Sequence, residues 1–134
     1  MKVFALDSNI VSYLLKNSGG VAEKINAEID NGNQVVIPAI VYYEVRRGLL
    51  AIDAPAKTAA FVKLCEALGI GTINADILNI AAIEHARLRK IGQPVDDADL
   101  LIAAECVHNG YTLVTNNTKH FDRIEKLEYV NWIE

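Results

Sequence analysis

The sequence predicts an α/β fold, a three-layer α/β/α sandwich with a mostly parallel sheet between two layers of helices. Short runs rich in β-branched residues alternate along the chain with longer stretches in which apolar residues recur at helical spacing. Turn-forming residues separate these segments, and strands that alternate with helices are typical of parallel sheets covered on both faces. A length of 134 residues is near the commonest domain size, so we expect one domain spanning residues 1–134.

The first half of the chain is expected to contain two strands, each followed by helix. The opening apolar run stops at Asp7-Ser8-Asn9, three residues that favour helix caps and turns. Pro38 can begin the helix after the second strand, because a missing N–H costs nothing in the first turn. The expected elements are a strand at residues 2–6, a short helix through Ile10 and Leu14, a helix at 21–29, a strand at 34–37 and a helix at 39–51.

The second half is expected to be mainly helical, with strands near its end. Asp53-Ala54-Pro55 and Gly92-Gln93-Pro94 interrupt the helical pattern, and Gly110 supplies a left-handed residue that ends the last long helix. The expected elements are helices at 55–68, 76–91 and 96–108, strands at 71–73 and 112–115, a helical turn at 118–121 and an edge strand at 128–130.

The formal net charge of −4 argues against a passive electrostatic nucleic-acid binder, which usually carries a basic surplus. Acidity does not exclude RNA as a substrate, because bound divalent cations offset carboxylates and local basic stripes can hold phosphates. A solvated helix face explains each stripe equally well. The stripes are Arg46-Arg47, then Arg87, Arg89 and Lys90, then Lys119, Arg123 and Lys126.

Two features indicate a cytoplasmic protein without a membrane anchor. Cys65 and Cys106 stand alone inside apolar helical patterns, without a CxxC motif or zinc-ligand spacing, so both are expected in the core as reduced thiols. Asp7 comes too early for the apolar stretch of a signal peptide, and no run of about eighteen uncharged apolar residues occurs.

Glu44 stands out because it lies on the apolar face of its expected helix. Positions three and four residues apart share a face, which aligns Glu44 with Ile40, Val41 and Gly48. A carboxylate that faces the core destabilises the fold unless it is paired or bound to metal. One explanation is an ion pair with Arg47 along the same helix, and the other is a metal site.

Two aspartates open helices in a similar way. Asp7 closes the first strand and precedes a helix, while Asp99 lies near the start of an almost wholly apolar helix. Capping explains each singly, as it does Asp96 and Asp97, because a helix N-terminus favours a carboxylate. Three such carboxylates, Asp7, Glu44 and Asp99, predict a hard-cation site in a fold that gathers strand ends.

No competing catalytic site is visible in the sequence. His85, His108 and His120 lie far apart without an HxxxH arrangement, and each is expected at the surface or in a satisfied position. No GxSxG motif indicates a hydrolase triad, and no glycine-rich phosphate loop follows the first strand.

Four motifs occur in order along the chain: Asp7-Ser8-Asn9, Tyr43-Glu44-Val45-Arg46-Arg47-Gly48, Asp99-Leu100-Leu101-Ile102-Ala103-Ala104, and Leu113-Val114-Thr115-Asn116-Asn117-Thr118-Lys119-His120-Phe121. Together they resemble a PIN-domain nuclease, and most closely a VapC-type toxin of a bacterial type II toxin–antitoxin pair. The resemblance covers essentially the whole chain.

The resemblance implies a metal-dependent endoribonuclease. Asp7, Glu44 and Asp99 would bind Mg²⁺ or Mn²⁺ and, with Asn117, form the catalytic set that directs a metal-activated water at a phosphodiester. Asn117 falls where many members carry a fourth acidic residue, and an amide oxygen brings no charge to a second metal. Thr115 and Asn116 would help to orient this corner.

The resemblance also implies substrates and partners. Structured RNA, with tRNA favoured, would be cut at a single-stranded loop, where bases can be splayed out and read. A homodimer is expected, together with a cognate VapB-type antitoxin that lies over the active site and inserts a basic side chain among the acids. No membrane partner is expected.

Two other interpretations remain open at this point. A catalytically weak or inactive PIN-like module that binds RNA or a protein is favoured by Asn117, although the three carboxylates argue against it. The other is an α/β phosphatase or phospho-acceptor domain that uses Asp7 as nucleophile. The phosphatase version expects a second aspartate two residues on, where this chain has Asn9.

Overall fold

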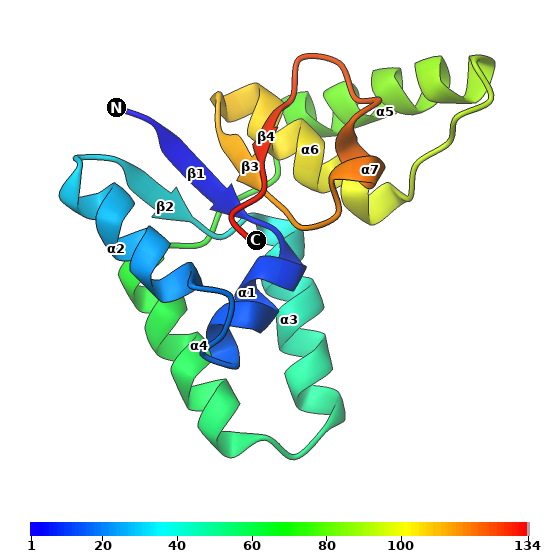
Figure 1. Cartoon of the computed structure of the whole chain (residues 1–134). Helices are drawn as coiled ribbons and strands as arrows, with labels where there is room; N and C mark the ends of the chain where they lie inside the picture. The colour runs from blue at the N-terminus through cyan, green and yellow to red at the C-terminus, as the bar shows by residue number, and fades with distance from the viewer. Residues whose placement is uncertain (134) are drawn as a thin grey trace.

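A computed structural model describes residues 1–133, with four strands and seven helices (Figure 1). The observed bounds lie within a residue or so of the expected ones for every element except the strand expected at 71–73. In chain order the elements are β1 (Val3–Leu6), α1 (Ser8–Leu15), α2 (Val21–Asp30), β2 (Gln34–Val36), α3 (Ala39–Ala51), α4 (Pro55–Leu68), α5 (Ala75–Lys90), α6 (Asp97–Asn109), β3 (Thr112–Val114), α7 (Thr118–Phe121) and β4 (Glu128–Val130).

The four strands form one sheet in the order β2-β1-β3-β4, and every pair is parallel. The chain therefore crosses over between paired strands by way of helices, as the alternating pattern predicted. Leu6, the last residue of β1, is in register with Val114, the last residue of β3. The carboxyl ends of the two central strands thus lie side by side, which is where open α/β sheets place ligands.

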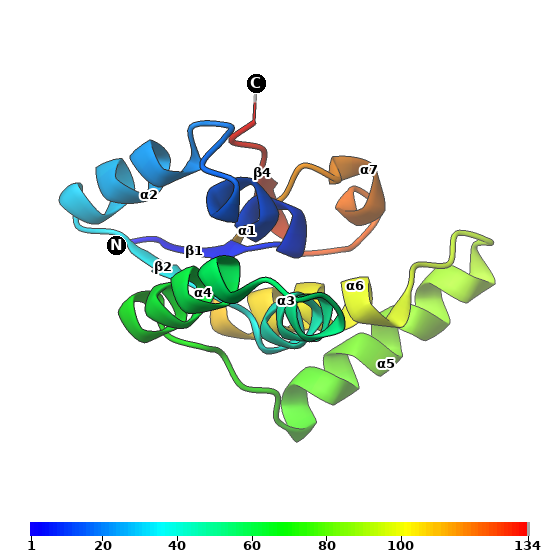
Figure 2. The same cartoon turned by 90° about the horizontal axis from the view of Figure 1, so that it is seen from below.

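Helices cover both faces of the sheet and complete the expected three layers (Figure 2). The helices α1 and α2 lie on one face, whereas α3, α4, α5 and α6 lie on the other. Most of α6 is buried, in keeping with its apolar sequence, and it packs against β3 and α5. Each fully buried isoleucine or leucine, such as Ile102 or Leu113, contributes about 1.5–3 kcal/mol to the stability of this core.

Both cysteines belong to the hydrophobic core as free thiols. Burial raises the pKa of the Cys106 thiol well above its usual range. A thiol in such a position stays protonated and unreactive, as expected for a structural cysteine.

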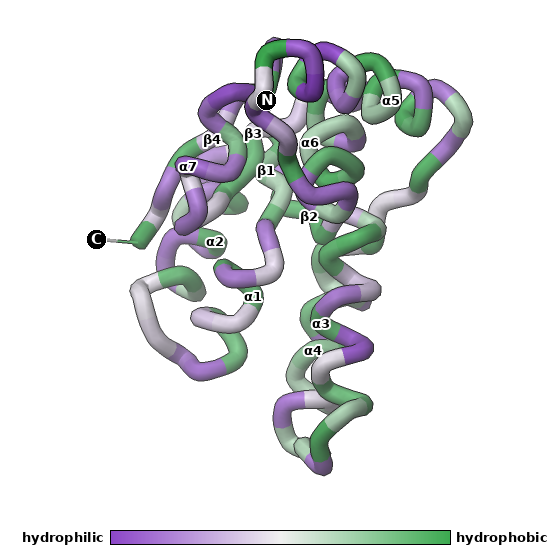
Figure 3. The backbone as a smooth tube through the Cα atoms, turned by 90° about the vertical axis from the view of Figure 1, so that its right-hand side faces the viewer, coloured by the Kyte–Doolittle hydropathy of each residue, from purple (hydrophilic) through white to green (hydrophobic). Residues whose placement is uncertain are grey.

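The helices α3 and α4 extend together beyond the sheet as a two-helix arm (Figure 3). The ring of Tyr42 on α3 stacks on that of Phe61 on α4, with 5.7 Å between centroids. Phe61 and Cys65 are the buried residues of α4, so apolar packing holds the two helices of the arm together. The inner side of the arm faces α1 and contributes to the candidate site.

The prediction of a strand at residues 71–73 is wrong. Only one isolated parallel bridge, between Ile37 and Ile70, forms in this segment. It is closed by hydrogen bonds from the Ile37 N–H to the Gly69 carbonyl (3.1 Å) and from the Gly71 N–H to the Ile37 carbonyl (2.7 Å). A glycine weakens a strand, and the chain must leave the sheet at once to begin α5, so no ladder can grow.

Candidate active site

Asp7 follows directly from β1 and is 3% exposed. Its Oδ1 accepts a hydrogen bond from the Ser8 N–H (2.8 Å), while Oδ2 accepts from the Thr115 hydroxyl (2.8 Å) and the Asn9 amide (3.2 Å). Burial raises the pKa of Asp7, and these hydrogen bonds oppose the rise. Asp7 is the N-cap of α1, so the capping interpretation holds, while its second oxygen is held by Thr115 and Asn9.

The segment after β3 holds Asp7 and α1 in place. The Thr115 hydroxyl donates to Asp7 and accepts from the Asn117 N–H at 2.9 Å, so it links the two strand ends. The Asn116 N–H donates to the Asn9 side chain (3.1 Å), which fixes the first turn of α1. Thr115 and Asn116 therefore orient this corner of the molecule as the motif suggested.

Glu44 projects from the middle of α3, where this helix packs against α1, and is half-buried. Its pKa is raised first by burial and then by the nearby carboxylate of Asp7, with a further contribution from Asp99. The ion pair with Arg47, one of the two explanations left open, does not form within residues 1–133, although the Arg47 charge opposes the rise in the pKa of Glu44. The Arg47 guanidinium instead lies over the Tyr43 ring, 5.1 Å from its centroid.

Asp99 is the third residue of α6 and does not cap it. The N-cap position belongs to Asp96, whose side chain makes no capping hydrogen bond. The Asp99 carboxylate lies 3.1 Å from His120 Nδ1 instead. Burial raises the pKa of Asp99, the Asp7 carboxylate raises it further, and His120 opposes the rise.

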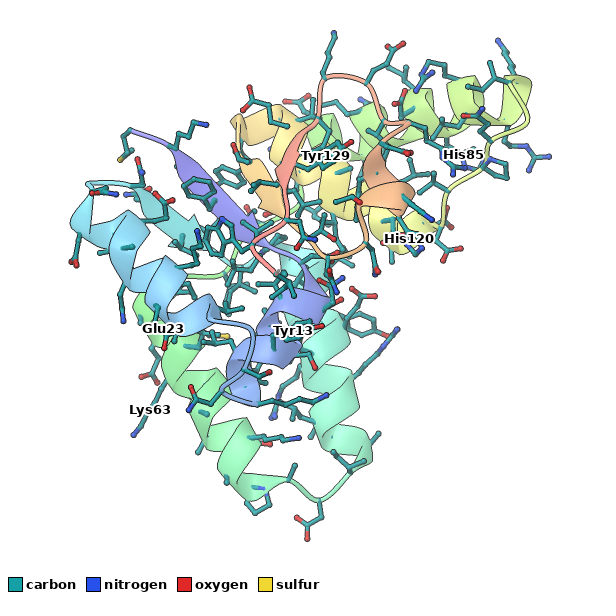
Figure 4. The ribbon with its side chains drawn as sticks, viewed as in Figure 1. Tyr13, Glu23, Lys63, His85, His120 and Tyr129 are labelled. Atoms are coloured by element: carbon teal, nitrogen blue, oxygen red, sulfur yellow. The ribbon has the colours of Figure 1, made fainter. Side chains whose placement is uncertain are left out.

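His120 is the site residue that sequence reasoning missed. It lies on α7, which packs against α6, so its ring reaches Asp99 across 21 residues of sequence (Figure 4). His120 is exposed, as expected, but it contacts the Asp99 carboxylate. Its place inside the fourth motif was the only available signal, because no spacing rule links a histidine to a carboxylate on another helix.

The three predicted carboxylates approach one another from separate elements, since the charge of Asp7 acts on both Glu44 and Asp99. Within residues 1–133, no three His, Cys, Asp or Glu side chains lie close enough to enclose a metal ion as they stand. An oxygen-only donor set of mutually repelling carboxylates fits a hard divalent cation such as Mg²⁺ or Mn²⁺, around which they could draw in.

A groove of about 410 Å³ runs along the inner side of the two-helix arm, and Glu44 is the one of the three acids that lines it. Asp99 lines a separate hollow together with His120. Ser8, Glu44 and Asn117 line one end. Lys16 of α1 and Lys57 of α4 line it as well, and neither belongs to the basic stripes recognised in the sequence. Asn117 is exposed, and its side-chain amide makes no hydrogen bond to the described part of the chain, unlike its backbone N–H. The side-chain amide is therefore available to a ligand. The groove therefore joins an acidic end to two exposed cations.

No helix in the described residues has the length and apolar character needed to cross a membrane.

Comparison with known families and curated proteins yields consistent matches. A family model described as PIN domain matches residues 4–127. The chain is 28% identical over 132 residues to ribonuclease VapC1 of Haemophilus influenzae strain R2866, an alignment that covers 97% of this chain and 98% of the relative. It is also 28% identical over 138 residues to the tRNA(fMet)-specific endonuclease VapC of Shigella flexneri, with 98% and 99% covered.

Solved structures agree with the sequence matches. The crystal structure of VapBC2 from Rickettsia felis bound to a DNA fragment from their promoter contains a similar chain, with a TM-score of 0.90, 26% identity, and 97% of this chain and 98% of that chain covered. The structure of VapBC-1 from nontypeable Haemophilus influenzae gives a TM-score of 0.82 at 29% identity, with the same coverage of 97% and 98%. These comparisons confirm the resemblance that the four motifs indicated.

Proposed function

Because this chain belongs to the PIN-domain family, we propose that it is an endoribonuclease that hydrolyses RNA at the site of Asp7, Glu44 and Asp99. One observation carries the proposal. Three carboxylates from β1, α3 and α6 approach one place, where the Asp7 charge adds to burial in raising the pKa of the other two. Acids arranged in this way destabilise the fold and mark a functional site.

Asp7, Asp99 and Glu44 would hold Mg²⁺ or Mn²⁺. When bound, such an ion polarises the scissile phosphate and lowers the pKa of the attacking water. Asp7 needs little reorganisation for this task, because the Ser8 N–H and the Thr115 hydroxyl already fix both of its oxygens. Asp99 is oriented in turn by His120, which leaves its other oxygen free.

Glu44 is the best-placed proton acceptor. It is half-buried on the groove side of α3. Its pKa is raised toward neutral pH relative to an ordinary glutamate, which makes the carboxylate a better proton acceptor. In the reaction, the oxygen of water bonds to phosphorus and one of its protons passes to Glu44. The P–O bond to the leaving ribose oxygen breaks, and this oxygen takes up a proton from solvent to become a hydroxyl group. Asn117, exposed beside the same groove, would contact the phosphate or the adjoining ribose as the fourth member of the catalytic set.

The substrate we propose is structured RNA, with tRNA favoured, cut in a single-stranded loop. The name of the Shigella flexneri relative, a tRNA(fMet)-specific endonuclease, supports this choice. Lys16 and Lys57, which line the same groove as Glu44, would contact the phosphates of an unpaired strand.

The biological role we propose is that of the toxin in a VapBC-type pair, acting in the cytoplasm as a homodimer. The similar chains were solved in VapBC complexes, which supports a VapB-type antitoxin as partner. The acidic site would attract a basic side chain of the antitoxin electrostatically and be blocked by it.

A cleavage assay with a chelator and an Asp7→Asn variant tests the proposed activity. Cleavage of tRNA should require added Mg²⁺ or Mn²⁺ and fall to background in the variant. The amide keeps the shape of Asp7, so the fold should persist. Asp30→Asn, at an exposed position at the end of α2, is the matched control and should remain active. Full cleavage by Asp7→Asn, or by the wild-type chain in excess chelator, would sink the proposal.

A further inference from the structure

Glu105 is a buried acid with no part in the chemistry described above. It lies on α6 at 1% exposure, among apolar neighbours. Its Oε1 accepts a hydrogen bond from the Ala39 N–H at 2.9 Å. Its Oε2 is equally buried and has no hydrogen-bond partner within residues 1–133. A half-satisfied carboxyl group in a core is unfavourable, so its presence calls for a role.

The surroundings of Glu105 leave room for this carboxyl group and little else. A Cβ atom added to Gly71 would overlap Glu105 Oε2. The φ angle of Gly71 is not positive, so the glycine serves to make space rather than to permit a turn. Gly71 is itself tied to Ile37 by a 2.7 Å hydrogen bond, and Ile37 precedes Pro38 and the start of α3. The carboxyl group is therefore held between α6, the start of α3 and the Gly69–Gly71 segment.

The hydrogen bond from Ala39 connects the two helices that carry two of the site carboxylates. Ala39 is the first residue of α3, and Glu44 lies five positions further along this helix. Asp99 precedes Glu105 by six positions on α6. Pro38, the N-cap of α3, has no side chain that can accept a hydrogen bond. Glu105, which is 66 residues away in sequence, accepts the Ala39 N–H at the start of α3 in its place.

We propose that Glu105 is a positioning residue, whose hydrogen bond to Ala39 holds α3 and α6 at the relative placement that brings Glu44 and Asp99 to one site. The inference rests on the proposed function, since it concerns the geometry of the same carboxylates. Glu105 contacts neither substrate nor cation and acts only through Ala39. Either protonation state leaves Oε1 able to accept from the Ala39 N–H, so the role does not depend on titration.

Two substitutions separate positioning from general stability. Glu105→Gln keeps an oxygen that can accept from Ala39, and Glu105→Leu fills the same volume without one. Replacing a buried, partly satisfied charge with an apolar side chain is often neutral or stabilising, so Glu105→Leu should unfold in urea at no lower concentration than the wild type. We expect Glu105→Leu to bind Mn²⁺ about tenfold more weakly by calorimetry without RNA, and to lower kcat with KM for RNA unchanged. Glu105→Gln should rescue both.

A double-mutant cycle with Gly71 tests the same contact independently. Gly71→Ala pushes against Oε2 and should weaken Mn²⁺ binding in the wild-type background. In a Glu105→Ala background the added methyl group meets no carboxyl, so it should cause no further loss. Equal losses in the two backgrounds would overturn the coupling.

The outcomes also separate this inference from the proposed function. Wild-type chain that binds Mn²⁺ and cleaves no RNA contradicts the proposed function, while the Mn²⁺ affinities still decide the role of Glu105. Wild-type affinity and kcat in Glu105→Leu would overturn the inference. Metal-free crystal structures of the wild type and Glu105→Leu decide it even for a chain that binds no Mn²⁺, because α3 must shift relative to α6; helices that superimpose would overturn it.

Discussion

The Thr115 hydroxyl donates a 2.8 Å hydrogen bond to Asp7 Oδ2 across 108 residues of sequence. The Thr115 hydroxyl oxygen also accepts a hydrogen bond from the Asn117 N–H. One side chain at the end of β3 therefore fixes both the buried acid at the end of β1 and the start of the next loop.

Removal of this hydroxyl should impair the site more than the fold. Thr115→Val keeps the shape of the side chain but leaves Asp7 Oδ2 and the Asn117 N–H without this partner, at a cost of about 1–3 kcal/mol in the free energy of unfolding. Mn²⁺ affinity should drop about tenfold, because Asp7 loses the hydrogen bond that fixes it to the end of β3. Calorimetry and urea unfolding measure the two effects, and Thr115→Ser, which retains the hydroxyl, is the control that should lose neither.

His120 should assist cation binding by orienting Asp99. In His120→Ala, the Asp99 carboxylate loses its 3.1 Å partner, and we expect about tenfold weaker Mn²⁺ binding with an unchanged free energy of unfolding. Lys119→Ala, a change at the neighbouring exposed position of α7, serves as the control. Tighter binding in His120→Ala would mean that the histidine competes with the cation for Asp99, contrary to this prediction.

Lys16 and Lys57 should contribute to RNA binding rather than to the chemical step. The double variant Lys16→Ala/Lys57→Ala should raise KM for RNA several-fold with kcat unchanged, because both exposed cations line the groove and neither belongs to the proposed catalytic set. The salt dependence of RNA binding should also become shallower by about one to two in log–log slope. Lys63→Ala removes an equivalent charge on the outer side of α4 (Figure 4) and should change neither quantity.

The Glu84 carboxylate should give the fold a pH-dependent stability. It accepts hydrogen bonds from Arg87 Nε (2.7 Å) and Nη2 (2.8 Å) and from the Glu125 N–H (2.7 Å), which ties α5 to the segment after α7. The Arg87 hydrogen bonds come first among the causes that lower the pKa of Glu84 below its ordinary value of 4.5. The folded pKa is thus below the unfolded one, so the stabilisation is complete above about pH 4.5 and is lost as the pH falls through the folded value.

Substitution of Glu84 tests this dependence. Glu84→Gln should lower the free energy of unfolding by about 1–2 kcal/mol at pH 7 and by less at pH 3.5, where the wild type has lost part of the same contribution. Urea unfolding at the two pH values measures it. Glu125→Gln, whose exposed carboxylate lies 3.7 Å from Arg87, should change stability by less than about 0.5 kcal/mol at either pH. An equal loss for Glu84→Gln at both pH values would contradict the assignment.

The sequence predicted the layers of the fold and the three acids because both depend on local pattern. Asp7 follows a buried strand and Glu44 interrupts an apolar helix face, and each anomaly is visible without a structure. The contact between Asp99 and His120 depends on how α7 packs on α6, which no periodicity encodes. The positions of Lys16 and Lys57 beside one groove likewise follow from the packing of α1 against the arm.

One prediction was wrong for a reason that only packing reveals. The segment 71–73 looked like a strand, but a side chain at Gly71 would overlap the Glu105 carboxyl group, which packs against it. Of the two explanations left open for Glu44, the ion pair with Arg47 does not form within the described residues. Arg47 lies over the ring of Tyr43, four positions away on the same helix, although its charge still lowers the pKa of Glu44.

The parallel pairing of β1 with β3 has a consequence for the newly made chain. Asp7 leaves the ribosome early, but its partner strand and Thr115 emerge only after most of the protein has been translated. Until β3 docks, Asp7 lacks its hydrogen bond to Thr115, and Glu44 of α3 and Asp99 of α6 are not yet held near Asp7 by the completed sheet. The site proposed for Asp7, Glu44 and Asp99 therefore cannot assemble until synthesis of the chain is almost complete.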